Sequence, residues 1–198
     1  NAYDADVAIV TTVDLDHTGW LGNSREAIGF EKAGIFRAGK PAFCADPEPP
    51  RSLLEYAQTI GAGLCLIGRD FGYALADNEW RWWSGGQQFV LPAPAMPGKA
   101  QYRNAAVALA ALQAAGLTVP DEAIAQGLRE TRLPGRFQIV RESPLIVVDV
   151  AHNPQAVRVL AENLAHLPKT GRTHAIVGML ADKDAGAALV ALKNEVDV

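Results

Sequence analysis

Short apolar runs alternate with amphipathic stretches along the first part of the chain. Residues 6–13 are mostly apolar and β-branched, which is typical of a strand buried on both faces of a parallel sheet. Similar runs at 41–45 and 64–67 predict two more strands. Helix-like patterns separate these runs at 23–39 and 50–60. The alternation predicts an α/β fold.

Both predicted helices carry signals at their ends. Asn23, followed by Glu26, resembles a capping box, and Gly39 ends the first helix. The Pro49-Pro50 pair begins the second helix, and Gly61 ends it.

The pattern changes between residues 73 and 92. Short runs separated by Asp77-Asn78 and Gly85-Gly86 predict a small antiparallel meander. Trp80 and Trp82 share one face of its middle strand. Covering a core is favoured for them over stacking on a ligand.

A loop and two helices are expected next. Residues 93–102 are rich in Pro, Ala and Gly and predict a connection, and 104–115 and 120–131 predict helices. The break at 133–136 is the predicted domain boundary.

The predicted domains are therefore residues 1–132 and residues 133–198. The second is expected to begin another α/β unit with these elements: strands 137–141, 145–150 and 173–179, and helices 154–167 and 184–195.

Composition and charge exclude some classes of function. Apolar residues make up 49% and charged residues 20% of the 198 residues, so the chain can bury a core. The net charge of −4 and the absence of Lys/Arg runs argue against a nucleic-acid partner. No stretch is long and apolar enough to cross a membrane, and nothing near residue 1 predicts secretion, so a cytoplasmic protein is expected.

Residues 34–41 nearly match the phosphate-loop pattern G-x-x-x-x-G-K-[ST], but two features argue against that role. Pro41 replaces the hydroxyl residue that would hold Mg²⁺. The segment also lies where a helix ends and a strand begins, whereas phosphate binding requires a strand, a glycine loop and then a helix N-terminus. Gly39-Lys40 is instead interpreted as a helix stop with a cation near the C-terminal dipole.

Three groups of residues could carry chemistry, and the first follows the first predicted strand. Asp14-Leu15-Asp16-His17 lies at the carboxyl end of that strand, where ligands gather in open α/β sheets. An acid beside an imidazole could bind metal or move protons. A loop histidine that caps a carbonyl is the more common alternative.

The second candidate is Lys32, within the first predicted helix. Ile28, Ile35 and Phe36 lie at turn spacing from it, which could place its amine near the buried side. A partly desolvated lysine is more easily neutral and therefore more open to covalent modification. A solvated surface lysine is the alternative.

The third candidate surrounds Asp149. A carboxylate that ends an apolar strand is costly without a partner, and Asn153-Pro154 predicts a helix N-terminus directly after it, with amides suited to an anion. Capping by Asp149 explains part of this pattern but not His152 beside it, so a functional site is favoured. Arg136, at the domain boundary, is well placed to reach a phosphate.

Together these segments resemble the Mur ligase superfamily, and within it the folylpolyglutamate and dihydrofolate synthase branch. In chain order, the matching segments are Leu15-Asp16-His17-Thr18 with Leu21-Gly22, Glu31-Lys32-Ala33-Gly34-Ile35, Asn104-Ala105-Ala106, Leu133-Pro134-Gly135-Arg136-Phe137 and Asp149-Val150-Ala151-His152-Asn153-Pro154. The peptidoglycan Mur ligases share this layout and are the closest alternative. They typically carry a different residue at the position of Asn153 and lack the Leu-Asp-His-Thr form.

The resemblance implies an enzyme that uses ATP and Mg²⁺ to join L-glutamate to dihydropteroate or a folate. It implies a P-loop-type ATP-binding domain up to residue 132, including the meander, and a Rossmann-like domain after it. It also favours a monomer.

The resemblance also implies roles for individual residues. His17 would be a Mg²⁺ ligand, and Lys32 would be carbamylated by CO₂, which turns a cation into a carboxylate-like group near the metal. Asn104, Arg136 and Asp149 would contact ATP, the last two from the second domain.

The implied chemistry is acyl activation. The substrate carboxylate attacks the γ-phosphate to give an acyl phosphate, and the amine of L-glutamate then displaces phosphate. His152, with Asp149 nearby, would help position the glutamate.

The chain departs from the full family pattern. A complete member has a glycine-rich phosphate loop and a metal-binding acid upstream of the position of Asn1, and it has further strands in the second domain. Both ends of this chain therefore read as cuts through a larger fold, and the chain alone is expected to have no ligase activity.

Two other classes of function stay open at this point. A non-catalytic nucleotide-binding module is weakened by the lack of G-x-G-x-x-G after a strand. A purely structural role is the other.

Overall fold

We describe the fold from a computed structural model of the chain, which covers residues 3–15, 18–76, 79–168, 171–181 and 183–197. The chain divides into two compact units, Asn1–Pro94 with Gln101–Glu130, and Ala95–Ala100 with Thr131–Val198. The domain boundary between residues 132 and 133 stays a prediction.

The first unit is built on a parallel sheet of three strands in the order β1-β2-β3. The strands are β1 (Ala8–Val10), β2 (Pro41–Cys44) and β3 (Gly63–Leu66). Both pairings are parallel, with Ala8 opposite Ala42 and Ala42 opposite Leu64. The predicted α/β sheet is therefore confirmed, although β1 is shorter than the run at 6–13 suggested.

Side chains on the central strand β2 alternate between two cores, because successive residues of a strand point to opposite faces. Ala42 and Cys44 are fully buried in a core on one face of the sheet, which they share with helix residues. Phe43 and Ala45 belong to a second core on the other face. Burial on both faces explains why these strands read as continuous apolar runs.

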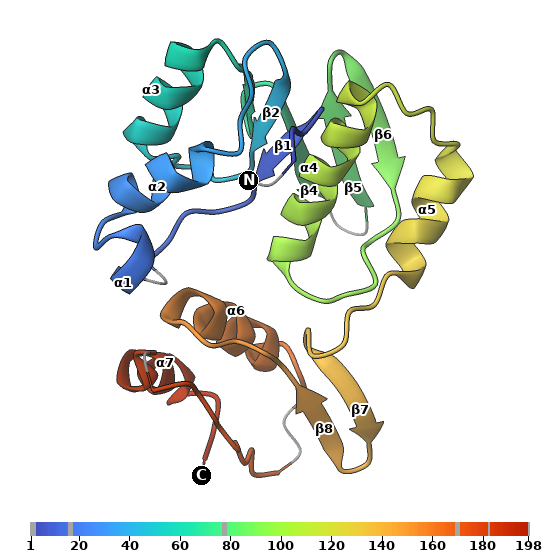
Figure 1. Cartoon of the computed structure of the whole chain (residues 1–198). Coiled ribbons are helices and arrows are strands. Elements are labelled where there is room, and N and C mark those ends of the chain that lie inside the picture. The colour runs from blue at the N-terminus through green and yellow to red at the C-terminus, as the bar shows by residue number, and fades with distance from the viewer. Residues whose placement is uncertain (1–2, 16–17, 77–78, 169–170, 182, 198) are drawn as a thin grey trace. The chain divides into compact units, whose positions relative to one another are not determined.

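Helices α2 (Arg25–Ala33) and α3 (Arg51–Ile60) pack on the first face of the sheet, and the short helix α1 (Thr18–Leu21) precedes them (Figure 1). The predicted start and end of α2 are wrong. Its N-cap is Ser24, whose side chain accepts a hydrogen bond from the amide of Ala27, so the capping box expected from Asn23 does not form. The helix also ends at Ala33, well before Gly39.

The opposite face of the sheet carries the meander β4 (Phe71–Ala76), β5 (Glu79–Ser84) and β6 (Gln87–Leu91). Its antiparallel pairing confirms the prediction. Trp80 and Trp82 are 1% and 3% exposed, and the indole Nε1 of Trp82 donates to the carbonyl of Ala106 at 2.9 Å. Both tryptophans belong to the core, as predicted.

Helix α4 (Lys99–Ala114) covers the same face, followed by α5 (Asp121–Glu130). The small buried side chains Ala106, Ala110 and Ala111 face the aromatic residues of the meander. The predicted loop at 93–102 is too long, because α4 begins at Lys99 rather than at Asn104.

The second unit contains the antiparallel pair β7 (Gln138–Glu142) and β8 (Leu145–Val148), then α6 (Pro154–Ala165) and α7 (Ala185–Leu192). Asn153 is the N-cap of α6, as predicted, and its side chain accepts from the amide of Ala156 at 2.8 Å. The small core of this unit contains Val157, Ala188 and Leu192.

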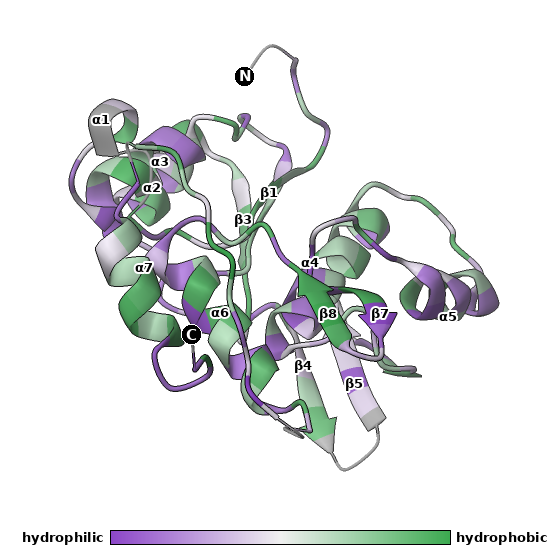
Figure 2. Ribbon diagram, turned by 90° about the horizontal axis from the view of Figure 1, so that it is seen from below, coloured by the Kyte–Doolittle hydropathy of each residue, from purple (hydrophilic) through white to green (hydrophobic). Residues whose placement is uncertain are grey.

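The strand predicted at 173–179 does not form in the structure. A strand needs hydrogen-bonding partners along its edge, and the only described partner of β8 is β7. Several apolar side chains of this unit are consequently exposed: Ile139, Val140, Leu145, Ile146, Val148, Val150, Ile176, Val177 and Leu180. Figure 2 shows the apolar character of β8 and α7.

Within the part of the chain that the structure describes, no helix combines the length and the apolar character needed to cross a bilayer.

Candidate functional site

The strand ends of the first unit hold a network of polar groups around one buried carboxylate. Strands β1 and β2 are parallel, so their carboxyl ends lie at the same edge of the sheet, the usual ligand side of open α/β sheets. Val13 follows β1 and Asp46 follows β2 at this edge. Asp46 is only 5% exposed, which is unusual for a carboxylate.

Three hydrogen bonds compensate for the burial of Asp46. Its Oδ2 accepts from the amide of Val13 at 2.8 Å and from the guanidinium of Arg25 at 3.0 Å. Its Oδ1 accepts from the amide of Glu48 at 2.9 Å. Burying a charge without such partners would cost on the order of several kcal/mol.

Arg25, the first residue of α2, completes the network. Its Nε donates to the carbonyl of Val13 at 2.8 Å, and its Nη2 donates to the carbonyl of Glu48 at 2.8 Å. We call the side chains of Arg25 and Asp46, with the main-chain groups of Val13 and Glu48, the clamp. The sequence pattern did not predict it; the available signal was an acid directly after a predicted strand.

The segment after Val13 carries the first predicted site. The carboxylate of Asp14 accepts from the amide of Leu15 at 2.8 Å. Asp16 and the predicted metal ligand His17 lie outside the described residues, so the prediction for His17 stays a prediction.

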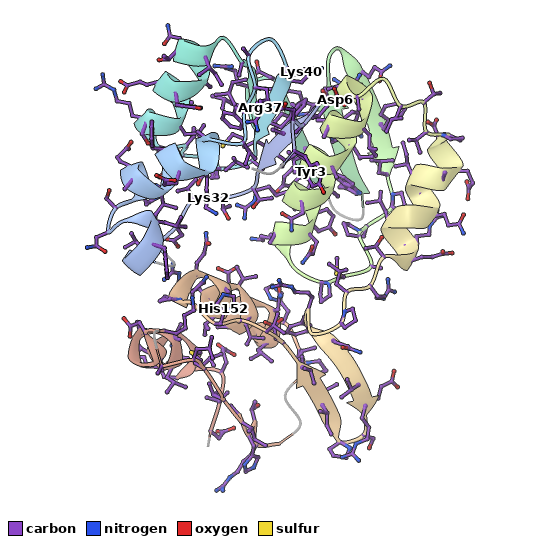
Figure 3. The ribbon with its side chains drawn as sticks, viewed as in Figure 1. Tyr3, Asp6, Lys32, Arg37, Lys40 and His152 are labelled. Atoms are coloured by element: carbon purple, nitrogen blue, oxygen red, sulfur yellow. The ribbon has the colours of Figure 1, made fainter. Side chains whose placement is uncertain are left out.

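Lys32 extends from the last turn of α2 and is half-buried (Figure 3). Ile28 and Phe36, predicted to pack near it, are buried at 0% and 2% exposure. Its amine makes no hydrogen bond or ion pair with any residue that the structure describes. A half-buried amine without a partner suits covalent modification, but carbamylation itself stays a prediction.

The described residues alone do not make up a metal site. Over the described ranges, no group of three His, Cys, Asp or Glu side chains is placed to hold a metal ion. Asp46 is committed to the clamp. An uncommitted Lys32 amine fits the oxygen donor that carbamylation would create, and hard cations prefer oxygen ligands.

Asn104, predicted to contact nucleotide, lies exposed on α4, and its Nδ2 donates to Gln101 at 3.4 Å. Helices α2 and α4 pack on opposite faces of the sheet. The structure therefore does not bring Lys32 and Asn104 together.

In the second unit, Asp149 connects two loops. Its Oδ2 accepts from the amide of Phe137 at 2.7 Å, and its Oδ1 accepts from the amide of Ala151 at 2.8 Å. The main-chain amide of Val150 also donates to the carbonyl of Gly135 at 2.8 Å. The strand-end carboxylate thus holds the turn that contains Arg136.

The turn around Arg136 is conformationally constrained. Phe137 is buried and has a φ of 45°, in the left-handed region that non-glycine residues rarely adopt. A Cβ at Gly135 would lie 2.7 Å from Val150, so only glycine fits there. The guanidinium of Arg136 is exposed and makes no hydrogen bond or ion pair with a described residue.

His152 lies between Asp149 and the N-terminus of α6. Its Nδ1 is 2.9 Å from the carbonyl of Val150, a distance at which a protonated Nδ1 donates. The structure therefore brings Arg136, Asp149 and His152 to one region of the second unit, through short main-chain contacts.

A cavity of about 330 Å³ lies elsewhere, between the meander and helices α4 and α5. Its lining is mostly apolar and includes Trp82, Phe89, Leu109 and Ile124. None of the predicted site residues that the structure describes lines it.

Comparison with known proteins gives the family context. Residues 135–198 match the family model of the Mur ligase glutamate ligase domain. The dihydrofolate synthase/folylpolyglutamate synthase of Escherichia coli (strain K12) is 49% identical over the whole chain, and the match covers 46% of that relative. The corresponding protein of Haemophilus influenzae is 33% identical, again over the whole chain and 48% of the relative.

Solved structures agree with the sequence relatives. Escherichia coli FolC in complex with DHPP and ADP superposes with a TM-score of 0.91 at 49% identity, covering 98% of this chain and 46% of that one. A bifunctional folylpolyglutamate synthase/dihydrofolate synthase with Mn, AMPPNP and L-glutamate bound superposes with a TM-score of 0.89 at 47% identity, over 98% and 46% of the two chains.

The chain thus spans about half the length of the relatives it matches. The matches confirm the Mur ligase-like α/β fold predicted from the sequence. This chain is similar to the dihydrofolate synthase/folylpolyglutamate synthases over all of its 198 residues, and its residues 135–198 match the Mur ligase glutamate ligase domain.

Proposed function

We propose that this chain is part of an ATP-dependent ligase that adds L-glutamate to dihydropteroate, to folates, or to both. The observation that carries the proposal is the 49% identity to the Escherichia coli dihydrofolate synthase/folylpolyglutamate synthase over all 198 residues. That identity extends through both units, so it supports more than a shared nucleotide-binding domain.

Ligands named in the related structures support the reactants and cofactors. The structure of one relative is a complex with DHPP and ADP, and that of another contains Mn, AMPPNP and L-glutamate. ATP and Mg²⁺ are therefore the proposed cofactors of this protein. A cytoplasmic location and a monomeric state stay predictions.

The metal site would be formed by His17 and by Lys32 in its carbamylated form. Bound Mg²⁺ would neutralise charge on the transferring phosphoryl group. Lys32 contributes an amine that makes no hydrogen bond or ion pair with a described residue, and Ile28 and Phe36, at helical spacing from it, are buried.

Asn104, Arg136 and Asp149 are proposed to bind the nucleotide. The exposed guanidinium of Arg136 offers a planar set of donors that suits phosphate oxygens. Asp149 holds the adjacent main chain through the amide of Phe137, so Arg136 extends from a fixed turn. Fixed donors stabilise developing charge better than mobile ones, because they need no reorganisation during the reaction.

The proposed reaction has two steps. The substrate carboxylate attacks the γ-phosphate of ATP, which releases ADP and leaves an acyl phosphate. The amine of L-glutamate then attacks the acyl carbon, and inorganic phosphate leaves as the amide forms. His152, beside the N-terminus of α6, is proposed to position the incoming glutamate, whose carboxylates suit free helix amides.

A chimera tests the proposal. This chain replaces the matching segment of the Escherichia coli relative, and ATP-dependent incorporation of labelled L-glutamate into dihydropteroate and tetrahydrofolate is measured. We expect turnover. Arg136→Ala should reduce kcat/KM about a hundredfold, the size expected when one group that stabilises transition-state charge is removed.

Arg129→Ala is the matched control, because Arg129 is an exposed arginine on α5 that the proposal gives no role. Its chimera should keep full activity. A folded chimera without ligase activity, or equal activity in the two arginine variants, would contradict the proposal.

The competing classes give different outcomes. A peptidoglycan Mur ligase would turn over a nucleotide-linked muramyl substrate instead of a pteroate. A non-catalytic module would bind ATP without turnover, and its Lys32 would be acetylated freely. A CO₂-labile mass increase on Lys32 would favour the ligase.

A further inference from the structure

We propose that the cavity between the meander and helices α4 and α5 binds a neutral bicyclic aromatic molecule whose edge carries a hydrogen-bond donor beside an acceptor, as a lactam does. The cavity lies within the first unit and has a volume of about 330 Å³. An apolar cavity of about 150 Å³ takes a benzene ring, so this volume suits two fused rings. The inference does not depend on the proposed function, because none of the described residues given a role there lines the cavity.

The end of α4 gives the cavity a fixed wall. This helix ends in a Schellman motif, in which the amide of Gly116 donates to the carbonyl of Gln113 at 3.0 Å and the amide of Leu117 donates to the carbonyl of Leu112 at 3.2 Å. Gly116 has the left-handed φ of 69° that this motif requires. All four residues of the motif line the cavity. The wall is therefore formed by main-chain hydrogen bonds of the fold itself, and ligand sites are usually pre-formed to a similar degree.

Two aromatic side chains form another part of the lining. Trp82 and Phe89 are cross-strand partners in β5 and β6, with ring centroids 5.6 Å apart and an interplanar angle of 31°. The side-chain donor of Trp82 is already used, since its indole Nε1 donates to the carbonyl of Ala106 at 2.9 Å. Together with Leu109 and Ile124, these rings make the lining mostly apolar. A flat aromatic molecule suits such surfaces, because aromatic rings pack well in offset and edge-to-face arrangements.

Two side-chain amides supply the polar part of the lining. Gln113 Nε2 donates to Gln87 Oε1 at 2.9 Å, which leaves Gln113 Oε1 as an acceptor and Gln87 Nε2 as a donor. A lactam matches this pair, because its N–H donates while its neighbouring C=O accepts. Over the described lining, the only charged side chain is the exposed Asp121, so neither an anion nor a cation would find a buried counter-charge. The expected ligand is therefore neutral.

Binding would strengthen the attachment of α5. Within this helix, which the structure describes throughout, no residue is buried. Ile124 and Leu128 pack against the core while only half-buried. A ligand in the cavity would contact Ile124 and the meander at once, and each added contact favours the folded position of α5. Amide exchange in α5 should consequently slow when the ligand binds.

The first measurement uses carbostyril, a bicyclic lactam, titrated into this chain and followed by nuclear magnetic resonance. We expect a Kd below about 1 mM, which about eleven non-hydrogen atoms reach at a modest binding energy per atom. The shifted signals should include the side-chain amides of Gln87 and Gln113. N-methylcarbostyril keeps both rings but lacks the N–H, so it should bind about tenfold more weakly. Absence of binding, equal affinity of the two compounds, or shifts at other sites alone would overturn the inference.

Two variants test whether the compound occupies this cavity. Gln113→Met removes the acceptor and keeps the length of the side chain, so carbostyril should lose its advantage over N-methylcarbostyril. The matched control, Gln126→Met on the exposed surface of α5, should retain that advantage. Ile124→Phe adds ring volume inside the cavity and should weaken carbostyril binding about tenfold. Leu128→Phe, one turn later on α5 and outside the described lining, should leave binding unchanged.

Circular dichroism establishes that each variant is folded. A folded Gln113→Met chain that keeps the preference for carbostyril would overturn the assigned hydrogen bond. A folded Ile124→Phe chain that binds carbostyril as the wild type does would overturn the assignment to this cavity. If Ile124→Phe does not fold, the comparison of Gln113→Met with Gln126→Met decides the outcome.

Discussion

At the residue scale, the side chain of Glu26 forms hydrogen bonds with a helix other than its own. It lies in the first turn of α2, yet its carboxylate accepts from the amides of Arg51 and Ser52 at 3.1 and 2.7 Å. Those amides begin α3, whose N-cap residue, Pro50, has no side-chain hydrogen bond to offer. Glu26 therefore caps a helix that follows much later in the sequence.

These contacts make the stability of the chain depend on pH. Hydrogen bonding by the Ser52 amide lowers the pKa of Glu26 from its usual value of 4.5, against a smaller opposing effect of desolvation. A carboxyl whose pKa falls on folding contributes stability above its unfolded pKa, and this contribution is lost as pH drops through the folded pKa. Glu26→Gln should lower the melting temperature at pH 7, and the difference from wild type should vanish below the lowered pKa.

Glu31→Gln is the control for this experiment, since Glu31 is an exposed acid on the same helix. Thermal unfolding followed by circular dichroism at several pH values gives the comparison. A Glu26 effect that stays constant down to pH values far below the usual pKa would contradict the capping role.

Asp149 carries a second prediction at this scale. Its bond to the amide of Phe137 stabilises a backbone conformation that costs a non-glycine residue about 1 to 2 kcal/mol. Asp149→Asn removes the charge and at least one acceptor, with an expected cost of about 1 to 2 kcal/mol. Amide exchange of Phe137 should become about tenfold faster, whereas Glu142→Gln at the end of β7 should leave it unchanged. Unchanged exchange of the Phe137 amide in Asp149→Asn would show that this hydrogen bond does not stabilise the turn.

At the scale of elements, replacing glycine by alanine is expected to change stability in opposite directions at two positions. Gly61 ends α3 with a φ of 70°, and nothing lies within 4 Å of a Cβ added there. The cost of Gly61→Ala is therefore conformational, about 1 kcal/mol. Gly127 lies inside α5 with equally open surroundings. Gly127→Ala should stabilise by about 0.5 to 1 kcal/mol.

Urea unfolding of the two variants measures both free energies. Opposite signs are the expected result. A stabilising Gly61→Ala would show that the left-handed helix end is not maintained in solution.

At the scale of the whole molecule, we expect the 198-residue chain to have no ligase activity by itself. Its only near match to a phosphate loop is residues 34–41, where Pro41 occupies the hydroxyl position. In the structure, Lys40 of this segment pairs with Asp6 at 2.8 Å, and the segment leads from α2 into β2 (Figure 3).

The measurement is labelled-glutamate incorporation by the isolated chain, run beside the active chimera. The chain should give no signal above the no-enzyme blank, while the chimera turns over. Turnover by the isolated chain would mean that it binds phosphates in a way that none of its motifs predicts.

The local pattern of the sequence was enough for most elements of the fold. It predicted the parallel strands, the meander and the core positions of Trp80 and Trp82, because periodicity of 2 or 3.6 residues directly reports burial. It also predicted the start of α6 at Asn153-Pro154, since a cap acts over only a few residues. The family resemblance, carried by short motifs, agrees with the relatives that match this chain along all of its residues.

Only the tertiary structure decided which polar groups meet across long sequence distances. Glu26 reaches α3, and Asp46 meets Val13 and Arg25, although nothing in the spacing of these residues predicts the pairs. The strand expected at 173–179 also depends on partners elsewhere, because a strand is stable only beside another strand. Sequence patterns report what each segment prefers locally, and hydrogen bonds between distant segments are fixed only when the chain folds.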